Sequence, residues 1–375
     1  MLTRYSADEK GRLAKKALVY TQQEHHLTPD SLDKDALFII DKLKRHGFDA
    51  FVVGGAVRDL LVGHVPKDFD IVTDATPPKI KKLFKNSRVI GKRFRLVHVI
   101  FGQKIFEVST FRSIAEGTIG NVFGTMDEDA LRRDFSFNAL YYDPEKNQVI
   151  DYVGGVADIK RRLVRPVIPL DHIFAEDPVR MIRAVKYAAC MGFRLPHKVK
   201  KRIVSQAKLL QGISPSRITE ELLKIVNSSR SFAIVSMALK TNVFAYLQPA
   251  ACKLMEEDKS FKASYLANLQ AMDSLVRTDP ASRLGERLFF LIKDFMEHIS
   301  DWKQQAQSRS PSEIYKRAWE VCRGFVLPMN PQRVELDFAV KKELALLGIK
   351  VKPRRTSTRK SSPRTTDQDT PPSTS

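Results

Sequence analysis

Residues 51–73 read FVVGGAVRDLLVGHVPKDFDIVT, and this stretch decides the fold. The apolar run 48–53 predicts a strand that ends at the glycine pair Gly54-Gly55, where a helix is expected to begin. Residues 68–73 predict a second short strand. Glycine lets the backbone approach a ligand closely, and amides at a helix start favour phosphate. A tight strand-to-helix turn also needs glycine for steric reasons, so the pair alone is a weak indication.

Asp68 and Asp70 stand two positions apart in the second predicted strand. Residues i and i+2 of a strand point to the same face, so both carboxylates would converge while Phe69 enters the core. Neighbouring carboxylates repel each other unless a cation lies between them. Mg²⁺ is the expected cation, because it takes oxygen ligands and bridges substrate phosphates. In isolation such a pair is more often a solvated strand end.

A third acid, Glu107, lies in the predicted strand 105–110. Burying an acid in an apolar strand is costly unless the acid is paired or metal-bound, and the alternative is an edge-strand residue that faces water. Together with the glycine turn and the two aspartates, Glu107 predicts a two-metal site for phosphoryl transfer. One metal would activate the attacking hydroxyl, and the other would hold the triphosphate.

The sequence outside this stretch changes character near residue 165. Strands and a few helices precede that point, and almost only helical patterns follow it from 177 to about 348. We therefore predict an α/β head with a mixed sheet, followed by an all-helical neck and body. The expected parts are an N-terminal arm over 1–30, the catalytic head over 31–165, a neck over 166–230, a body over 231–350 and a disordered basic tail over 351–375.

The charge of the chain favours a polyanionic partner. Its 375 residues include 63 Lys and Arg against 43 Asp and Glu, a net charge of +20. Residues 79–104 and 183–210 hold nine and eight basic residues and no acid, which indicates a nucleic-acid surface, although solvated helix faces look similar. Three cysteines exclude a disulfide scaffold, and no apolar run approaches the roughly 18 residues of a membrane helix. We expect a cytoplasmic protein with no membrane partner.

These motifs resemble those of the class II nucleotidyltransferases, the family of bacterial tRNA CCA-adding enzymes and bacterial poly(A) polymerases. The resemblance covers about residues 24–250 in order. It implies a polymerase-beta-like head that adds nucleotides to RNA 3′ ends without a template. The matching segments are 51–59, 67–70, RRDFSFN at 132–138, DYVGG at 151–155 and EDPVRMIR at 176–183.

The resemblance also implies roles for individual residues. Asp68 and Asp70 would hold two Mg²⁺ ions, and Glu107 would be the third catalytic carboxylate. The implied nucleotide contacts are Gly54, Gly55 and Arg58 at the triphosphate, Asp134 at the ribose with Arg133 and Arg132 nearby, and Asp177 and Arg180 at the base edge.

A physical argument supports the base-reading pair. Residues i and i+3 share a helix face, so Asp177 and Arg180 would offer an acceptor and a donor together. An ordinary surface ion pair has the same spacing, and without the upstream motifs that interpretation would be preferred.

The catalytic motifs do not separate poly(A) polymerases from CCA-adding enzymes. Residues 91–99, GKRFRLVHV, resemble a polymerase signature, in which Lys92, Arg93 and Arg95 would neutralise an RNA backbone. A basic loop with Phe94 in the core is the alternative. We expect a monomer that uses ATP and RNA 3′ ends. A CCA-adding enzyme and a noncatalytic RNA-binding relative are the alternatives, and the intact aspartate and glycine motifs argue against the second.

Overall fold

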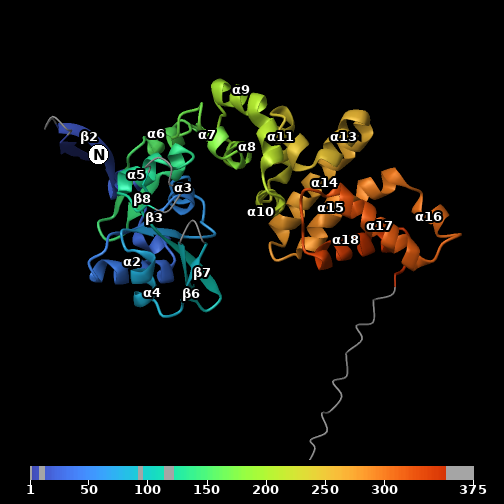
Figure 1. Ribbon diagram of the computed structural model, residues 1–375, viewed down its shortest axis with the longest axis horizontal. Coiled ribbons are helices and arrows are strands. Elements are labelled where there is room, and N and C mark those ends of the chain that lie inside the picture. The colour runs from blue at the N-terminus through green and yellow to red at the C-terminus, as the bar shows by residue number, and fades with distance from the viewer. Residues whose placement is uncertain (1, 8–12, 92–95, 114–121, 352–375) are drawn as a thin grey trace, which may run out of the picture.

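The computed structural model describes residues 2–7, 13–91, 96–113 and 122–351. A head built on one sheet and a region of helices lie side by side along the long axis of the molecule (Figure 1). This confirms the predicted mixed-sheet head followed by helices. The predicted disordered tail lies outside the described residues from 352 onward. Within the described ranges, no helix combines the length and the apolar character needed to cross a membrane.

Within the ranges that the structure describes, nine strands form the sheet of the head. They are β1 (Leu2–Ala7), β2 (Leu13–Thr21), β3 (Ala50–Val53), β4 (Asp70–Thr73), β5 (Ser87–Ile90), β6 (Leu96–Phe101), β7 (Lys104–Thr110), β8 (Leu140–Asp143) and β9 (Gln148–Asp151). Their order is β1-β2-β9-β8-β3-β4-β7-β6-β5. The β4–β7 pair is parallel and the other neighbouring strands are antiparallel, so the sheet is mixed.

The centre of the sheet brings the decisive stretch together. All four residues of β3 are buried, since the strand pairs on both sides and its side chains enter apolar clusters on both faces. In the β3–β4 register Val53 pairs with Asp70. The glycine turn that follows β3 and the first residue of β4 therefore lie at the same edge of the sheet.

Helices cover the sheet and fix its orientation. Helix α2 (Lys34–Arg45) begins where the Asp33 carboxylate accepts a hydrogen bond from the Asp35 amide, 2.8 Å away. Gly47 follows the helix with φ of +80°, a left-handed conformation typical of the residue after a helix end. Helix α4 (Pro77–Leu83) contacts α2, and the two cover one face of the sheet.

The N-terminal segment differs from the partly ordered arm that we predicted. Strands β1 and β2 form a hairpin, and β2 pairs with β9 through Leu18 and Asp151. The hairpin therefore forms one edge of the sheet. A local pattern cannot reveal this arrangement, because the partner strand lies more than a hundred residues further along the chain.

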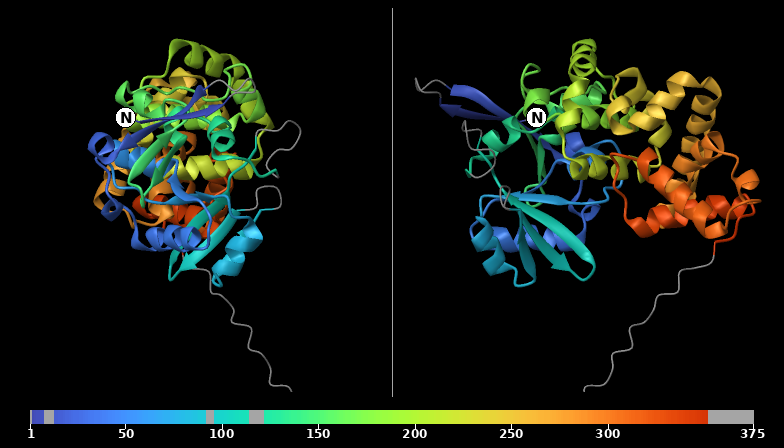
Figure 2. Two further views of the ribbon diagram at one scale, coloured as in Figure 1. Left: turned by 90° about the vertical axis from the view of Figure 1, so that its left-hand side faces the viewer. Right: turned by 45° about the vertical axis from the view of Figure 1, so that its right-hand side comes forward.

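The region after residue 165 is helical (Figure 2), and its helices pack around an apolar core. Helix α15 (Leu284–Ile299) contacts both α14 (Lys259–Thr278) and α18 (Arg333–Leu346).

The other helices of the described residues, those of the head included, are α1 (Gln22–His25), α3 (Gly55–Leu61), α5 (Met126–Leu131), α6 (Gly155–Lys160), α7 (Ile173–Glu176), α8 (Val179–Met191), α9 (His197–Gln206), α10 (Pro215–Val226), α11 (Ser231–Lys240), α12 (Phe244–Leu247), α13 (Pro249–Glu257), α16 (Trp302–Gln305) and α17 (Pro311–Phe325). Short 3₁₀ turns lie at Pro29–Ser31, Ser136–Asn138 and Ala207–Gly212.

The turn between β9 and α6 is tightly fixed. The buried Asp151 carboxylate accepts hydrogen bonds from four successive backbone amides, those of residues 153–156. A Cβ atom on Gly155 would lie 2.2 Å from the carbonyl oxygen of Ser136, a distance that no side chain can occupy. Gly155 therefore lets this turn pack directly on the segment that follows the Arg-Arg-Asp motif.

Candidate functional site

Three carboxylates gather at the edge of the sheet where β4 begins. The parallel register pairs Ile71 with Val108, which puts Asp70 beside Glu107 on the neighbouring strand. Asp68 is close enough to influence Asp70 electrostatically. However, Asp68 precedes β4 by two residues and so lies outside the strand that we predicted to carry it, whereas Phe69 packs against the core as predicted.

The groups around Asp70 leave its carboxylate in a region of excess negative charge. Its side chain is accessible to solvent, but the surrounding protein partly desolvates the carboxylate and this raises its pKa. Glu107 and then Asp68 add like-charge repulsion, which Arg133 and Arg183 only partly offset, so the pKa of Asp70 rises to about 6. The direction of this shift follows from the arrangement of the charges.

This arrangement fits a divalent cation. Among the described residues, no three acidic, histidine or cysteine side chains already stand in a metal-ligand arrangement. Mg²⁺ does not need such a cage, since it is commonly held by one or two carboxylates, water and substrate phosphates. Asp68 and Asp70 would supply the carboxylates, and a bound cation would remove the like-charge repulsion on Asp70.

Glu107 is exposed rather than buried, with 54% of its side chain accessible. It lies on an internal strand, between β4 and β6, so it is not the edge-strand residue of the alternative interpretation. Its Oε1 lies 3.5 Å from Nε2 of His98 on β6. His98 is thus a neighbour of the site that sequence reasoning did not single out.

The glycine turn leads into α3, which bears Arg58. Gly54 has φ of +74°, a conformation that favours glycine, and α3 begins at Gly55. Arg58 donates hydrogen bonds to the Asp59 carboxylate at 2.8 Å and to Oδ1 of Asn138 at 2.7 Å. The turn and the segment after the Arg-Arg-Asp motif are therefore held together through the arginine that we predicted to contact triphosphate.

The arginines of that motif are held by an acid that we did not predict to matter. Asp129 is fully buried, and Nη2 of Arg133 donates to its carboxylate at 2.8 Å. Arg132 and the Tyr141 hydroxyl donate to the same carboxylate. Nη1 of Arg133 would lie 3.4 Å from a Cβ on Gly54, so Asp129 holds Arg133 against the glycine turn.

Asp134 points toward the helical region. It is buried, and its Oδ1 accepts from the Phe135 amide at 2.8 Å and from the Asn138 amide group at 3.0 Å. Its Oδ2 lies 3.1 Å from Nη2 of Arg183 on α8. Asp134 thus joins the head to α8, and Arg183 is a residue of the site for which sequence reasoning gave no role.

The predicted base-reading pair is arranged differently from our expectation. Asp177 lies before α8 in an extended conformation, as the following proline favours, so it does not share a helix face with Arg180. Both Asp177 oxygens accept from Nη2 of Arg217 on α10, at 3.0 and 2.8 Å, and Arg180 donates to Glu176 at 2.9 Å. No sequence signal near the motif pointed to Arg217, which is 40 residues away.

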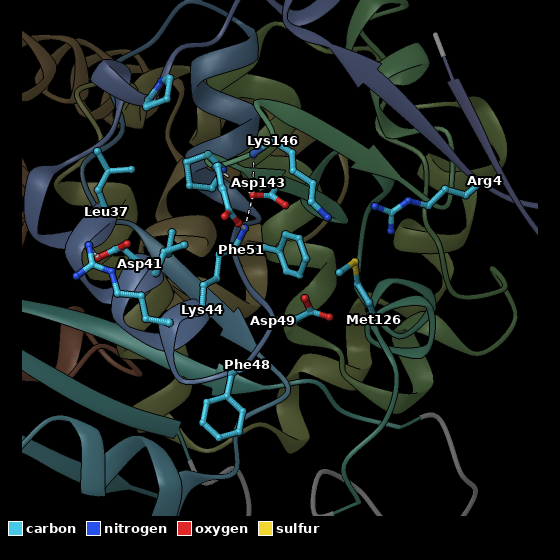
Figure 3. A pocket seen from close by; sticks show the side chains of 16 residues that line it. Arg4, Leu37, Asp41, Lys44, Phe48, Asp49, Phe51, Met126, Asp143 and Lys146 are labelled. Carbon is cyan, nitrogen blue, oxygen red and sulfur yellow. Dashed lines mark hydrogen bonds and ion pairs between the residues drawn. The ribbon is translucent and has the colours of Figure 1, made fainter.

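The predicted RNA contacts and one pocket are not part of the site formed by the three carboxylates and the glycine turn. The predicted RNA contacts Lys92, Arg93 and Arg95 lie outside the described residues. A pocket of about 680 Å³ opens at the opposite end of β3, where Asp49 and Phe51 line it and Lys44 is bonded to Asp143 (Figure 3). The pocket therefore does not coincide with the carboxylates.

Comparisons with known proteins identify the family of the chain. The family described as "Poly A polymerase head domain" matches residues 50–165, and "Probable RNA and SrmB- binding site of polymerase A" matches residues 192–255. The Poly(A) polymerase I of Salmonella typhi is 35% identical over 337 residues, which cover 83% of this chain and 72% of that protein. The chain belongs to the class II nucleotidyltransferase family.

Both branches of the family are among its relatives. The Poly(A) polymerase I of Escherichia coli O157:H7 is 37% identical over 275 residues, 69% of this chain, but only 59% of that protein's length is covered. The CCA-adding enzyme of Geobacillus kaustophilus is also 37% identical, over 59% of this chain and 56% of that enzyme.

A solved structure supports the fold over most of the chain. The crystal structure of the Bacillus stearothermophilus CCA-adding enzyme in complex with CTP aligns with a TM-score of 0.58 at 27% identity. The alignment covers 86% of this chain and 84% of that structure, so it spans the head and the helical region.

Proposed function

We propose that this protein is a poly(A) polymerase, which transfers AMP from ATP to the 3′ hydroxyl of RNA without a template. The hydroxyl oxygen forms a bond to the α-phosphorus, the bond to the β-phosphate oxygen breaks, and pyrophosphate leaves. The observation that carries the proposal is the crowding of Asp68, Asp70 and Glu107 beside the glycine turn and Arg58.

The residues divide this work between them. Asp68 and Asp70 are the proposed ligands of two Mg²⁺ ions, which would activate the attacking hydroxyl and neutralise the triphosphate when bound. Glu107 is the proposed third carboxylate. Arg58 is positioned by Asn138 to meet the triphosphate, and Arg133 stays beside the glycine turn because Asp129 holds it. Asp134 is proposed to contact the ribose.

Two observations favour ATP and a general RNA end over CCA addition. The match to Salmonella poly(A) polymerase extends over 83% of the chain, against 59% for the Geobacillus CCA-adding enzyme. The segment 91–99 also resembles the polymerase signature. CCA addition is the second candidate, because the solved CCA-adding enzyme shares the fold across head and helices.

A primer-extension assay separates the two. The full chain with Mg²⁺ is given ATP, CTP or both, on an oligo(A) primer or on a tRNA that lacks its CCA end. Long tails from ATP alone on oligo(A) are expected. Addition that requires CTP and stops after three nucleotides on the tRNA would identify the CCA enzyme, and no incorporation on either would support the noncatalytic relative.

The base-reading role needs a separate test, because the Asp177 carboxylate is bonded to Arg217, whereas the Arg180 guanidinium is bonded to Glu176. Replacing Arg180 with alanine is expected to raise CTP use relative to ATP while RNA affinity stays unchanged. An unchanged ATP preference in the Arg180→Ala variant would contradict the role. The Arg217→Gln variant then shows whether freeing Asp177 alters base choice by itself.

A further inference from the structure

A cluster of aromatic and basic side chains lies where α8 meets the head. Tyr187, on α8, is its central residue. The Tyr187 ring meets Phe135 and Phe137 edge-on, with ring centroids 5.9 and 5.4 Å apart and interplanar angles of 81° and 84°. Both phenylalanines follow the Arg-Arg-Asp motif directly, so the head fixes the orientation of this ring on two sides.

Three cationic groups surround the same ring. The guanidinium carbon of Arg58 lies 4.9 Å from the ring centroid, Nζ of Lys186 lies 5.6 Å away, and the guanidinium carbon of Arg183 lies 6.0 Å away. Arg58 belongs to the head, whereas the other two belong to α8. These distances are in the range of cation–π attraction, so one ring attracts cations from both regions.

The Tyr187 hydroxyl adds a polar contact to the ring. Nη2 of Arg183 donates a hydrogen bond to this oxygen at 3.4 Å. Burial would raise the pKa of the phenol, but Arg183, Arg58 and Lys186 outweigh that effect and lower the pKa of Tyr187. The oxygen therefore stands where negative charge is favoured, as expected of an acceptor that holds arginine side chains.

Arg58 and Arg183 each contact both the Tyr187 ring and a residue of the proposed nucleotide site. Arg58 bonds to Asn138 at 2.7 Å, and Arg183 lies 3.1 Å from Asp134. We propose that Tyr187 is a positioning residue for nucleotide binding, whose ring holds Arg58 at the triphosphate end of the nucleotide and whose hydroxyl holds Arg183 beside Asp134 at the ribose. The proposal rests on the proposed function, since that function supplies the nucleoside triphosphate.

The experiment compares two substitutions of Tyr187 in the full chain. Binding of ATP with Mg²⁺ is measured by calorimetry, and KM for ATP, kcat and RNA affinity are measured alongside it. Tyr187→Met keeps most of the bulk without the ring and is expected to weaken ATP binding about tenfold, with RNA affinity unchanged. Tyr187→Phe keeps the ring and is expected to restore ATP binding to within about threefold of wild type.

A matched control and a double variant show whether Tyr187 acts through Arg58. Tyr246→Met changes another partly buried tyrosine, on α12, and is expected to leave ATP binding unchanged. In an Arg58→Ala background, Tyr187→Met is expected to add no more than about threefold, the part that belongs to the hydroxyl, because the ring no longer has that guanidinium to hold. Full additivity of the two substitutions overturns the proposal.

Two further outcomes would also overturn it. The first is wild-type ATP affinity in Tyr187→Met. The second is that Tyr187→Met and Tyr246→Met both weaken ATP binding and RNA binding to the same extent, which would indicate general damage to packing. If Tyr187→Met does not fold, wild-type ATP affinity in Tyr187→Phe removes the hydroxyl from the proposal. Failure of the proposed function looks different, because wild-type protein would then extend no RNA although its ATP binding depends on Tyr187.

Discussion

Asp70 and Asp129 are both partly or fully desolvated carboxylates of the head, yet their pKa values are shifted in opposite directions. At Asp70, desolvation and the charge of Glu107 raise the pKa to about 6. At Asp129, burial alone would raise the pKa, but Arg133 and Arg132 lower it to about 2. The first carboxylate has like charges for neighbours, and the second has two guanidinium groups and a tyrosine hydroxyl.

The difference in pKa shift distinguishes Asp70, whose arrangement suits a bound cation, from Asp129, which stabilises the fold. A buried carboxylate with all its partners in place stabilises the native arrangement of those partners. A carboxylate crowded by others costs folding free energy until a cation arrives, and proteins keep such costs mainly at functional sites. The comparison therefore predicts activity effects at Asp70 and stability effects at Asp129.

The largest expected effect is the loss of activity in Asp70→Asn. Nucleotide transfer should fall by at least about 10,000-fold, because a proposed ligand of both metals is lost. The thermal midpoint should stay the same or rise, since repulsion from Glu107 is relieved. Primer extension and thermal unfolding measure the two effects. A variant that keeps near wild-type transfer would contradict the metal assignment.

Asp129→Asn should show the opposite profile. It leaves Arg132 and Arg133 without their buried counter-charge, so the free energy of unfolding should fall by about 3–5 kcal/mol. Urea unfolding measures this loss. Asp127→Asn is the matched control on the same helix, because its ion pair with Lys16 is solvent-accessible and should be worth less than about 1 kcal/mol. Equal effects of the two substitutions would show that Asp129 does not hold the fold.

Asp134→Asn tests an intermediate case. One of its oxygens is bonded within the head, and the other faces Arg183. The amide oxygen can still accept the hydrogen bonds from the head, so stability should fall by only about 1 kcal/mol. The charge that attracts Arg183 is lost, so KM for ATP should rise about tenfold. A stability loss as large as that of Asp129→Asn, without a change in KM, would place Asp134 with the structural acids.

The smallest expected effect is a pH dependence of stability at Asp70. Its folded-state pKa lies above the unfolded value of 3.8, so without Mg²⁺ the wild type should gain stability relative to Asp70→Asn as pH falls from about 6 to about 4. Protons and Mg²⁺ compete for the same carboxylate. The rise in melting temperature caused by Mg²⁺ should therefore shrink as pH falls below about 6, and a pH-independent rise would contradict the competition.

Local spacing in the sequence predicted the sheet edge of the site well. Strand periodicity and the glycine turn singled out Asp70, Glu107 and the turn itself, which the structure brings to the same end of the sheet. Arg58 was singled out by the family resemblance, and the catalytic roles of all these residues stay predictions. The predicted strand was too long at its start, because β4 begins at Asp70, two residues later than the apolar pattern indicated, although Asp68 still lies near Asp70.

Contacts between distant segments escaped prediction. The Asp177–Arg217 pair joins residues 40 positions apart, and Pro178 holds Asp177 extended, so helical spacing was the wrong guide. Asp129 and Tyr187 belong to no motif that we recognised, and their importance follows only from the arginines that surround them in space. The N-terminal hairpin was missed for the same reason, since its partner strand is distant in sequence.

The pairing of β2 with β9 also has a consequence for biosynthesis. Leu18 leaves the ribosome 133 residues before its partner Asp151. Translation proceeds at about 5–20 residues per second, so β2 is synthesised on the order of ten seconds before β9, the strand that pairs with it. During this interval the backbone of β2 can pair with other nascent chains. Slowing translation between these strands should therefore lower the yield of native protein more than slowing it after residue 151.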